Sequence, residues 1–97
     1  MGSWLVERRL ARVAARLRAL RAELATIDEQ IPYFTDDADD LAVRALVSDA
    51  PAASHESRDA QKHADAMRRH RKRVVSDIAE LEARQDHLLD QLTQRAR

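Results

Sequence analysis

The stretch "VERRLARVAARLRALRAELATIDEQI", from Val6 to Ile31, decides the fold of this 97-residue chain. Its aliphatic residues follow one another in alternating steps of four and three, the a/d pattern of a coiled-coil helix. Alanine, arginine and glutamate, all good helix formers, fill most of the positions between them. The apolar positions are Val6, Leu10, Val13, Leu17, Leu20, Leu24, Ile27 and Ile31. We therefore expect a helix over about residues 4–31, which Pro32 ends because proline disfavours a helical conformation in the preceding residue.

A second seam with the same alternating steps runs through the last third of the chain. It is polar at Arg71 and Gln85, and polar a positions lower stability while fixing register and partner number. Its positions are Ala60, Ala64, Met67, Arg71, Val74, Ile78, Leu81, Gln85, Leu88 and Leu92. We expect a long helix over about residues 52–95, which begins either at Pro51 as a first-turn residue or with Ser54 as N-cap.

An antiparallel alignment of the two seams brings Val6 near Leu92 and Ile31 near Met67. The stretch "FTDDADDLA", Phe34 to Ala42, then falls in the connection between the long helices. Thr35 is a good N-cap, and aspartates in a first turn favour the positive end of a helix. An apolar stripe follows at Ala38, Leu41, Ala42, Ala45 and Leu46. We expect a short third helix over about residues 36–48.

The predicted fold is therefore all-α: one domain over residues 1–97, built as a long antiparallel helical hairpin or coiled coil with a short third helix in its connection. Val75 and Leu89 lie beside the second seam and widen its apolar stripe. A wider stripe favours a further helix or a second copy of the chain. We expect a homodimer with Val75 and Leu89 in its interface.

Charge is segregated along a chain whose net charge is zero. Residues 32–59 hold seven acidic and two basic side chains, whereas residues 60–73 hold one acidic and six basic ones. The basic run "RRHRKR", Arg68 to Arg73, has three interpretations: internal pairing with the acidic segment, a protein-binding patch, or contact with nucleic acid. Nucleic acid is least favoured, because no aromatic residues interleave with the run. The candidate partner-binding residues are Asp36, Asp37, Asp39, Asp40, Arg68, Arg69 and Lys72.

Catalytic and metal chemistry find little support in the sequence. The chain has no cysteine, which excludes thiolate chemistry. It has one glycine, too few for a glycine-rich nucleotide-binding loop. His55, Asp59 and His63 step by four, but a metal site needs a third or fourth ligand in fixed geometry, so we expect them to be solvated. We expect no enzyme, no cofactor and no bound metal. No apolar run approaches the length of a membrane span, and we expect a cytoplasmic protein.

The segment "DADDLA", Asp37 to Ala42, resembles the Asp-x-x-Asp-x-Ala tip motif of the DksA family, with Asp37, Asp40 and Ala42 at the matching positions. Those factors insert a helical hairpin into the secondary channel of bacterial RNA polymerase. The resemblance implies a transcription regulator that presents Asp37 and Asp40 to the polymerase. The four-cysteine zinc module of that family has no counterpart here, because the chain lacks cysteine. This regulator is the alternative function. The function that we expect first is that of a small, non-enzymatic, self-associating coiled-coil protein that binds a protein partner through the charged end of its hairpin.

Overall fold

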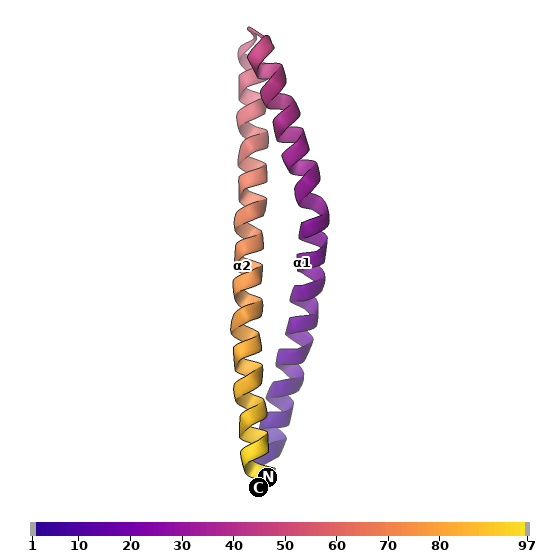
Figure 1. Cartoon of the computed structure of the whole chain (residues 1–97), viewed down its shortest axis with the longest axis vertical. Helices are drawn as coiled ribbons and strands as arrows, with labels where there is room; N and C mark the ends of the chain where they lie inside the picture. The colour runs from indigo at the N-terminus through magenta and orange to yellow at the C-terminus, as the bar shows by residue number, and fades with distance from the viewer. Residues whose placement is uncertain (1, 97) are drawn as a thin grey trace. The chain divides into compact units, whose positions relative to one another are not determined.

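The computed structural model describes residues 2–96. It contains two α-helices of 46 residues each, α1 (Gly2–Val47) and α2 (Pro51–Ala96), joined by residues 48–50 (Figure 1). No strand occurs among the described residues. The all-α class is confirmed, and so is its construction from two long helices.

The short third helix is wrong, and so is the end of the first helix at Pro32. Helix α1 passes through Pro32 and includes the segment expected to fold separately. A proline inside a helix costs about 3 kcal/mol, because its ring crowds the preceding turn and it donates no backbone hydrogen bond. The flanking residues Ile27 and Ala38 are buried, so packing against α2 offsets that cost. Thr35 consequently lies inside a helix and caps nothing.

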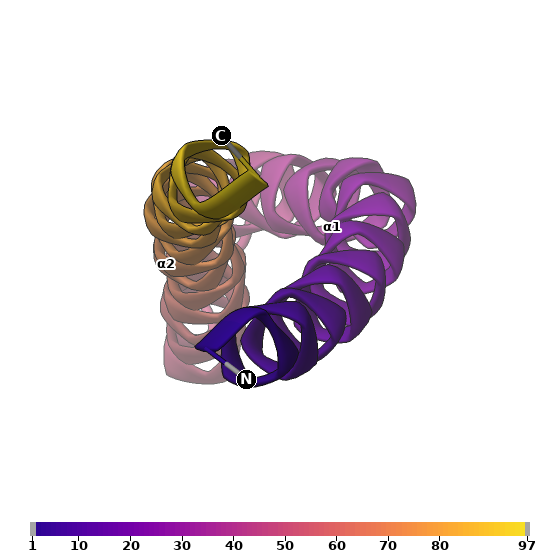
Figure 2. The same cartoon turned by 90° about the horizontal axis from the view of Figure 1, so that it is seen from below.

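Contacts divide the chain into two compact units, and each pairs part of α1 with part of α2. We name them the terminal unit, with residues up to Leu24 and from Val74 onward, and the hairpin unit, Ala25–Arg73. Figure 2 shows the start of α1 and the end of α2, which both belong to the terminal unit.

The core of the terminal unit consists of the aliphatic residues that the two seams predict. Leu17, Leu20 and Val6 are its most enclosed large side chains, at 1–2% exposure. Its buried residues are Val6, Val13, Leu17, Leu20, Val74, Ile78 and Leu88. The two helix segments are antiparallel, because Gly2 lies against Arg95 and the Arg21 guanidinium lies 3.4 Å from Glu82. The predicted proximity of Val6 and Leu92 agrees with this register, since Leu92 and Glu7 line one hollow at the chain ends.

Apart from Ile27, which is 3% exposed, the buried residues of the hairpin unit have small side chains. Ala38, Ala60 and Ala64 form its buried cluster, and Leu41 packs against it. Small residues at a contact allow two helices to approach closely. The predicted stripe after Thr35 is right for buried Ala38 and for half-buried Leu41 and Ala45. It is wrong for Ala42, which is exposed, and for Leu46, which is 87% exposed. Because these residues continue α1, only a narrow stripe of them faces α2, and Leu46 lies outside that stripe.

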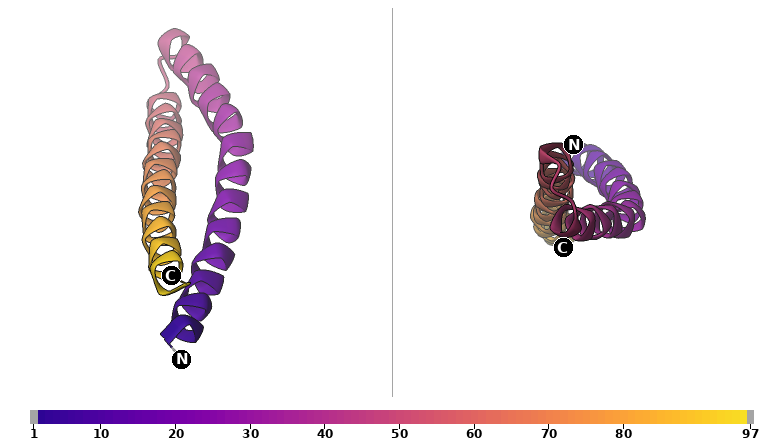
Figure 3. Two further views of the ribbon diagram at one scale, coloured as in Figure 1. Left: turned by 60° about the horizontal axis from the view of Figure 1, so that its bottom comes forward. Right: turned by 90° about the horizontal axis from the view of Figure 1, so that it is seen from above.

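The connection is three residues long, and Figure 3 shows it as the only non-helical link between the helices within residues 2–96. The Ala50 N–H donates to Ser48 Oγ at 3.2 Å, and the Ala53 N–H donates to the Ala50 carbonyl at 3.1 Å. Helix α2 begins at Pro51, where the missing N–H costs nothing because first-turn donors have no partner inside the helix. The aspartate-rich stretch therefore lies along α1 and not in the connection.

Candidate interaction surface

Each helix reverses its charge midway along its length. Residues 2–24 of α1 hold six arginines and two glutamates, while residues 25–47 hold six acidic residues and one arginine. In α2 the order is inverted: seven basic and three acidic residues over 51–73, then two basic and five acidic over 74–96. Each unit therefore pairs a basic helix segment with an acidic one. Complementary charge of this kind selects the antiparallel orientation, because a parallel pair would place like charges together.

Two arginines of α2 bind α1 on either side of Pro32. Arg71 donates from Nε to Asp28 Oδ1 at 2.6 Å and from Nη2 to Oδ2 at 3.4 Å. Arg68 donates to Thr35 Oγ1 at 3.1 Å and to Asp65 Oδ1 at 3.0 Å. Asp28 is also the residue whose carbonyl would accept from position 32 in an ideal helix, so these bonds hold α1 to α2 where its own ladder is interrupted. They also agree with the predicted proximity of Ile31 and Met67.

The Arg71 hydrogen bond lowers the pKa of Asp28, and its positive charge acts in the same direction. The same contacts raise the pKa of Arg71. An aspartate whose pKa is lower in the folded state stabilises the fold above its unfolded pKa of about 3.9, and that contribution disappears as pH falls through the folded value.

We therefore expect Asp28→Asn to reduce stability at neutral pH, and the difference from the parent protein to shrink as the pH falls below about 4. Urea unfolding followed by circular dichroism between about pH 2.5 and 7 measures it. Asp39→Asn is the matched control, because it removes an exposed aspartate of α1 that contacts no cation among the described residues. A difference independent of pH would contradict a role for the Asp28 charge.

The four aspartates of the "DDADD" stretch point outward. Asp36, Asp37, Asp39 and Asp40 are all exposed around buried Ala38, and none forms a hydrogen bond or ion pair within residues 2–96. The predicted pairing with the basic run is thus wrong for these aspartates, since Arg68 and Arg71 turn to Thr35 and Asp28 instead.

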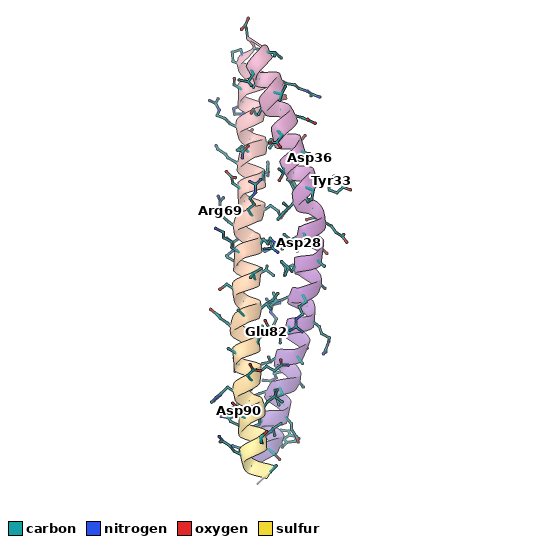
Figure 4. All side chains as sticks on the ribbon, in the orientation of Figure 1. Asp28, Tyr33, Asp36, Arg69, Glu82 and Asp90 are labelled. Carbon is teal, nitrogen blue, oxygen red and sulfur yellow. The ribbon has the colours of Figure 1, made fainter. Side chains whose placement is uncertain are left out.

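Other side chains of the hairpin unit share this exposure. Tyr33 is 77% exposed and points away from α2, whereas Asp28 points towards it (Figure 4). Arg69 and Lys72 are exposed on α2. All the predicted partner-binding residues are therefore exposed, and Arg68 is the one that bonds other side chains, Thr35 and Asp65. The structure does not gather the acidic and basic ones into one cluster.

An apolar patch near the connection has no counterpart in the sequence prediction. Val43, Leu46 and Val47 are 61%, 87% and 83% exposed, and their spacing places them on one side of α1. We name these three residues the end patch. Beside it lies an open groove of about 400 Å³, lined by Ala42, Ala45, Leu46, Ser54, Ser57 and Arg58. The sequence does contain one sign of this patch, because Val43 and Val47 are aliphatic residues that fall outside the predicted apolar stripe.

The remaining candidates lie apart from one another. Val75 and Leu89 are 40% and 47% exposed in the terminal unit, about 21 Å apart along α2 at 1.5 Å per residue. Glu82 lies midway between them and binds Arg21. His55 Nε2 lies 3.3 Å from Asp59 Oδ2, and no group of three or more potential metal ligands occurs within residues 2–96.

No protein-family model, curated protein or solved structure matches the chain. In the part of the chain that the structure describes, neither helix has an apolar stretch long enough to cross a membrane.

Proposed function

We propose that this chain is a non-enzymatic helical interaction protein that binds another protein through the exposed end of its hairpin unit. The end patch carries the proposal. Three neighbouring aliphatic side chains at 61–87% exposure are costly in water, at about 25 cal/mol per Å² of apolar surface. Contiguous exposed apolar residues with a polar surround are typical of protein-binding sites.

Two acidic residues close to the end patch suit the rim of such a site. Asp37 and Asp40 are exposed on α1, six and three residues before Val43, and have no contacts that would have to be broken. Rim charges raise association rates and exclude wrong partners more than they add affinity.

We also propose that the chain self-associates. Val75 and Leu89 remain 40% and 47% exposed beside the seam of α2, and a two-helix unit has no third helix to cover them. Leu89→Glu should weaken an interface that contains Val75 and Leu89, because it places a charge in an apolar contact.

Cross-linking tests the partner-binding surface. A photo-reactive amino acid at Val43 should give a defined adduct with another protein in the native cell, whereas the same residue at exposed Arg18 of α1, outside the end patch, should not. Adding Leu46→Asp to the Val43 probe should reduce the adduct at least about tenfold, because a charge replaces a central apolar contact. Leu46 is 87% exposed, so this change should alter stability by no more than about 0.5 kcal/mol. An adduct unaffected by Leu46→Asp would remove the end patch from the interface.

A second candidate is the transcription regulator, supported by Asp37 and Asp40, which are both exposed and unpaired in the described chain. If this candidate is right, a photo-reactive amino acid at Asp37 should give an adduct that contains an RNA polymerase subunit. Asp37→Asn with Asp40→Asn should then abolish an effect on transcription by purified polymerase while leaving helicity unchanged. An effect that persists in the double variant excludes this candidate.

A further inference from the structure

The terminal unit contains a groove lined by four arginines. Arg9, Arg12 and Arg16 of α1 and Arg84 of α2 surround a hollow of about 280 Å³ that also contacts Val13 and Leu81. Val13 is buried and Leu81 is half-buried, so the groove combines apolar residues with cationic walls. We name it the arginine groove.

No acidic residue lines the arginine groove. All four arginines are exposed, and none takes part in a hydrogen bond or ion pair among residues 2–96. Asp77 and Glu80 line an adjoining hollow with Arg16 and Arg84, yet no ion pair joins these four residues. Like charges gathered over low-dielectric side chains produce a field that attracts anions, and guanidinium groups bind carboxylates through two parallel hydrogen bonds.

The same chain carries a surface of opposite charge with matching spacing. Asp36, Tyr33 and Glu29 of α1 are exposed, and in this order they are separated by three and then four residues. Arg9, Arg12 and Arg16 are also separated by three and then four residues. An antiparallel approach of two helices brings the sets into register, with two carboxylates and one aromatic ring facing three guanidinium groups over about 10 Å. We name Glu29, Tyr33 and Asp36 the acidic row.

We propose that the arginine groove binds the acidic row of a second copy of the chain. The inference rests on the self-association proposed above and assigns residues to it. Arg9 faces Asp36 and Arg16 faces Glu29 of the other copy, while Arg12 stacks on its Tyr33 through a cation–π contact. Each copy carries one arginine groove and one acidic row, so the contact joins two identical chains.

A charge swap tests this pairing. Arg9→Glu with Arg16→Glu makes a groove variant, and Glu29→Lys with Asp36→Lys makes a row variant. Each alone places like charges opposite each other, so sedimentation at low salt should show its dimer dissociation constant raised at least about tenfold. Mixing the two variants restores opposite charges at both contacts, so the mixture should dimerise as the parent protein does. Higher salt should weaken the parent dimer.

Two further measurements keep the outcome decisive. Arg16 borders Asp77 and Glu80, so the single pair Arg9→Glu and Asp36→Lys repeats the swap if the double groove variant loses helicity. If the groove variant and the row variant each dimerise as tightly as the parent protein, the pairing of the arginine groove with the acidic row is overturned. A dimer lost in Leu89→Glu but kept in both charge variants overturns it too, while leaving self-association in place.

Two other outcomes would distinguish a failure of this pairing from a failure of self-association or of the proposed occupant. A parent protein that stays monomeric at about 1 mM and low salt overturns both the pairing and self-association, but not the partner site probed at Val43. A groove that binds a polyglutamate peptide without forming a dimer overturns the second copy as occupant.

Discussion

Leu17→Ala should lower the free energy of unfolding by about 2–4 kcal/mol. Leu17 is 1% exposed and, with Leu20 and Val6, forms the most enclosed part of the core. The substitution removes the transfer free energy of three carbon atoms and leaves a cavity that two neighbouring helices fill poorly. Domains of this size have only about 5–15 kcal/mol of stability, so the loss is a large part of the total.

Urea unfolding followed by circular dichroism measures this effect. Leu46→Ala is the matched control, because it makes the same chemical change at a residue that is 87% exposed. The control should shift stability by about 0.5 kcal/mol or less. Equal losses in both variants would show that Leu17 is not enclosed in solution.

Pro32→Ala should raise the free energy of unfolding by about 1–3 kcal/mol. Helix α1 continues through residue 32, so alanine supplies the N–H that proline lacks and relieves the crowding against the Asp28 carbonyl. The gain is smaller than the full helical penalty of proline, because proline also restricts the unfolded chain.

Pro51→Ala is the control for this prediction. Pro51 is the first residue of α2, where proline is favoured, so its replacement should be neutral or slightly destabilising. Destabilisation by Pro32→Ala would mean that the packing around Asp28 and Thr35 depends on the local geometry that proline imposes.

The seams could be predicted from the sequence because each rests on many residues. One flawed position, such as Arg71, does not interrupt an alternation of fours and threes that extends over several turns. The prediction failed at Pro32, where a single residue was weighed by its local preference alone. Burial of Ile27 and Ala38 on opposite sides of the proline outweighs that preference, and sequence spacing does not show how much burial a helix gains beyond a break.

The interaction surface was harder to predict than the fold. Exposure of the "DDADD" aspartates could be expected, but their lack of partners depends on where the α2 arginines point. Arg71 bonds Asp28 and Arg68 bonds Thr35, because the helix register places these partners within reach of the two side chains. The end patch was missed because its position as the last turn of α1, and not as part of a separate helix, depended on the continuity of α1 through Pro32.

The alanine cluster of the hairpin unit has a consequence for motion. Ala38, Ala60 and Ala64 each bury one side-chain carbon, whereas a buried leucine contributes four at about 0.8 kcal/mol per methylene. Helix segments held by so little apolar burial open locally at low free-energy cost, so their backbone amides exchange with solvent sooner than those around Leu17 and Leu20. The end patch lies beyond this cluster, so we expect its amides to exchange sooner than those around Leu17 and Leu20, and a bound partner to slow that exchange.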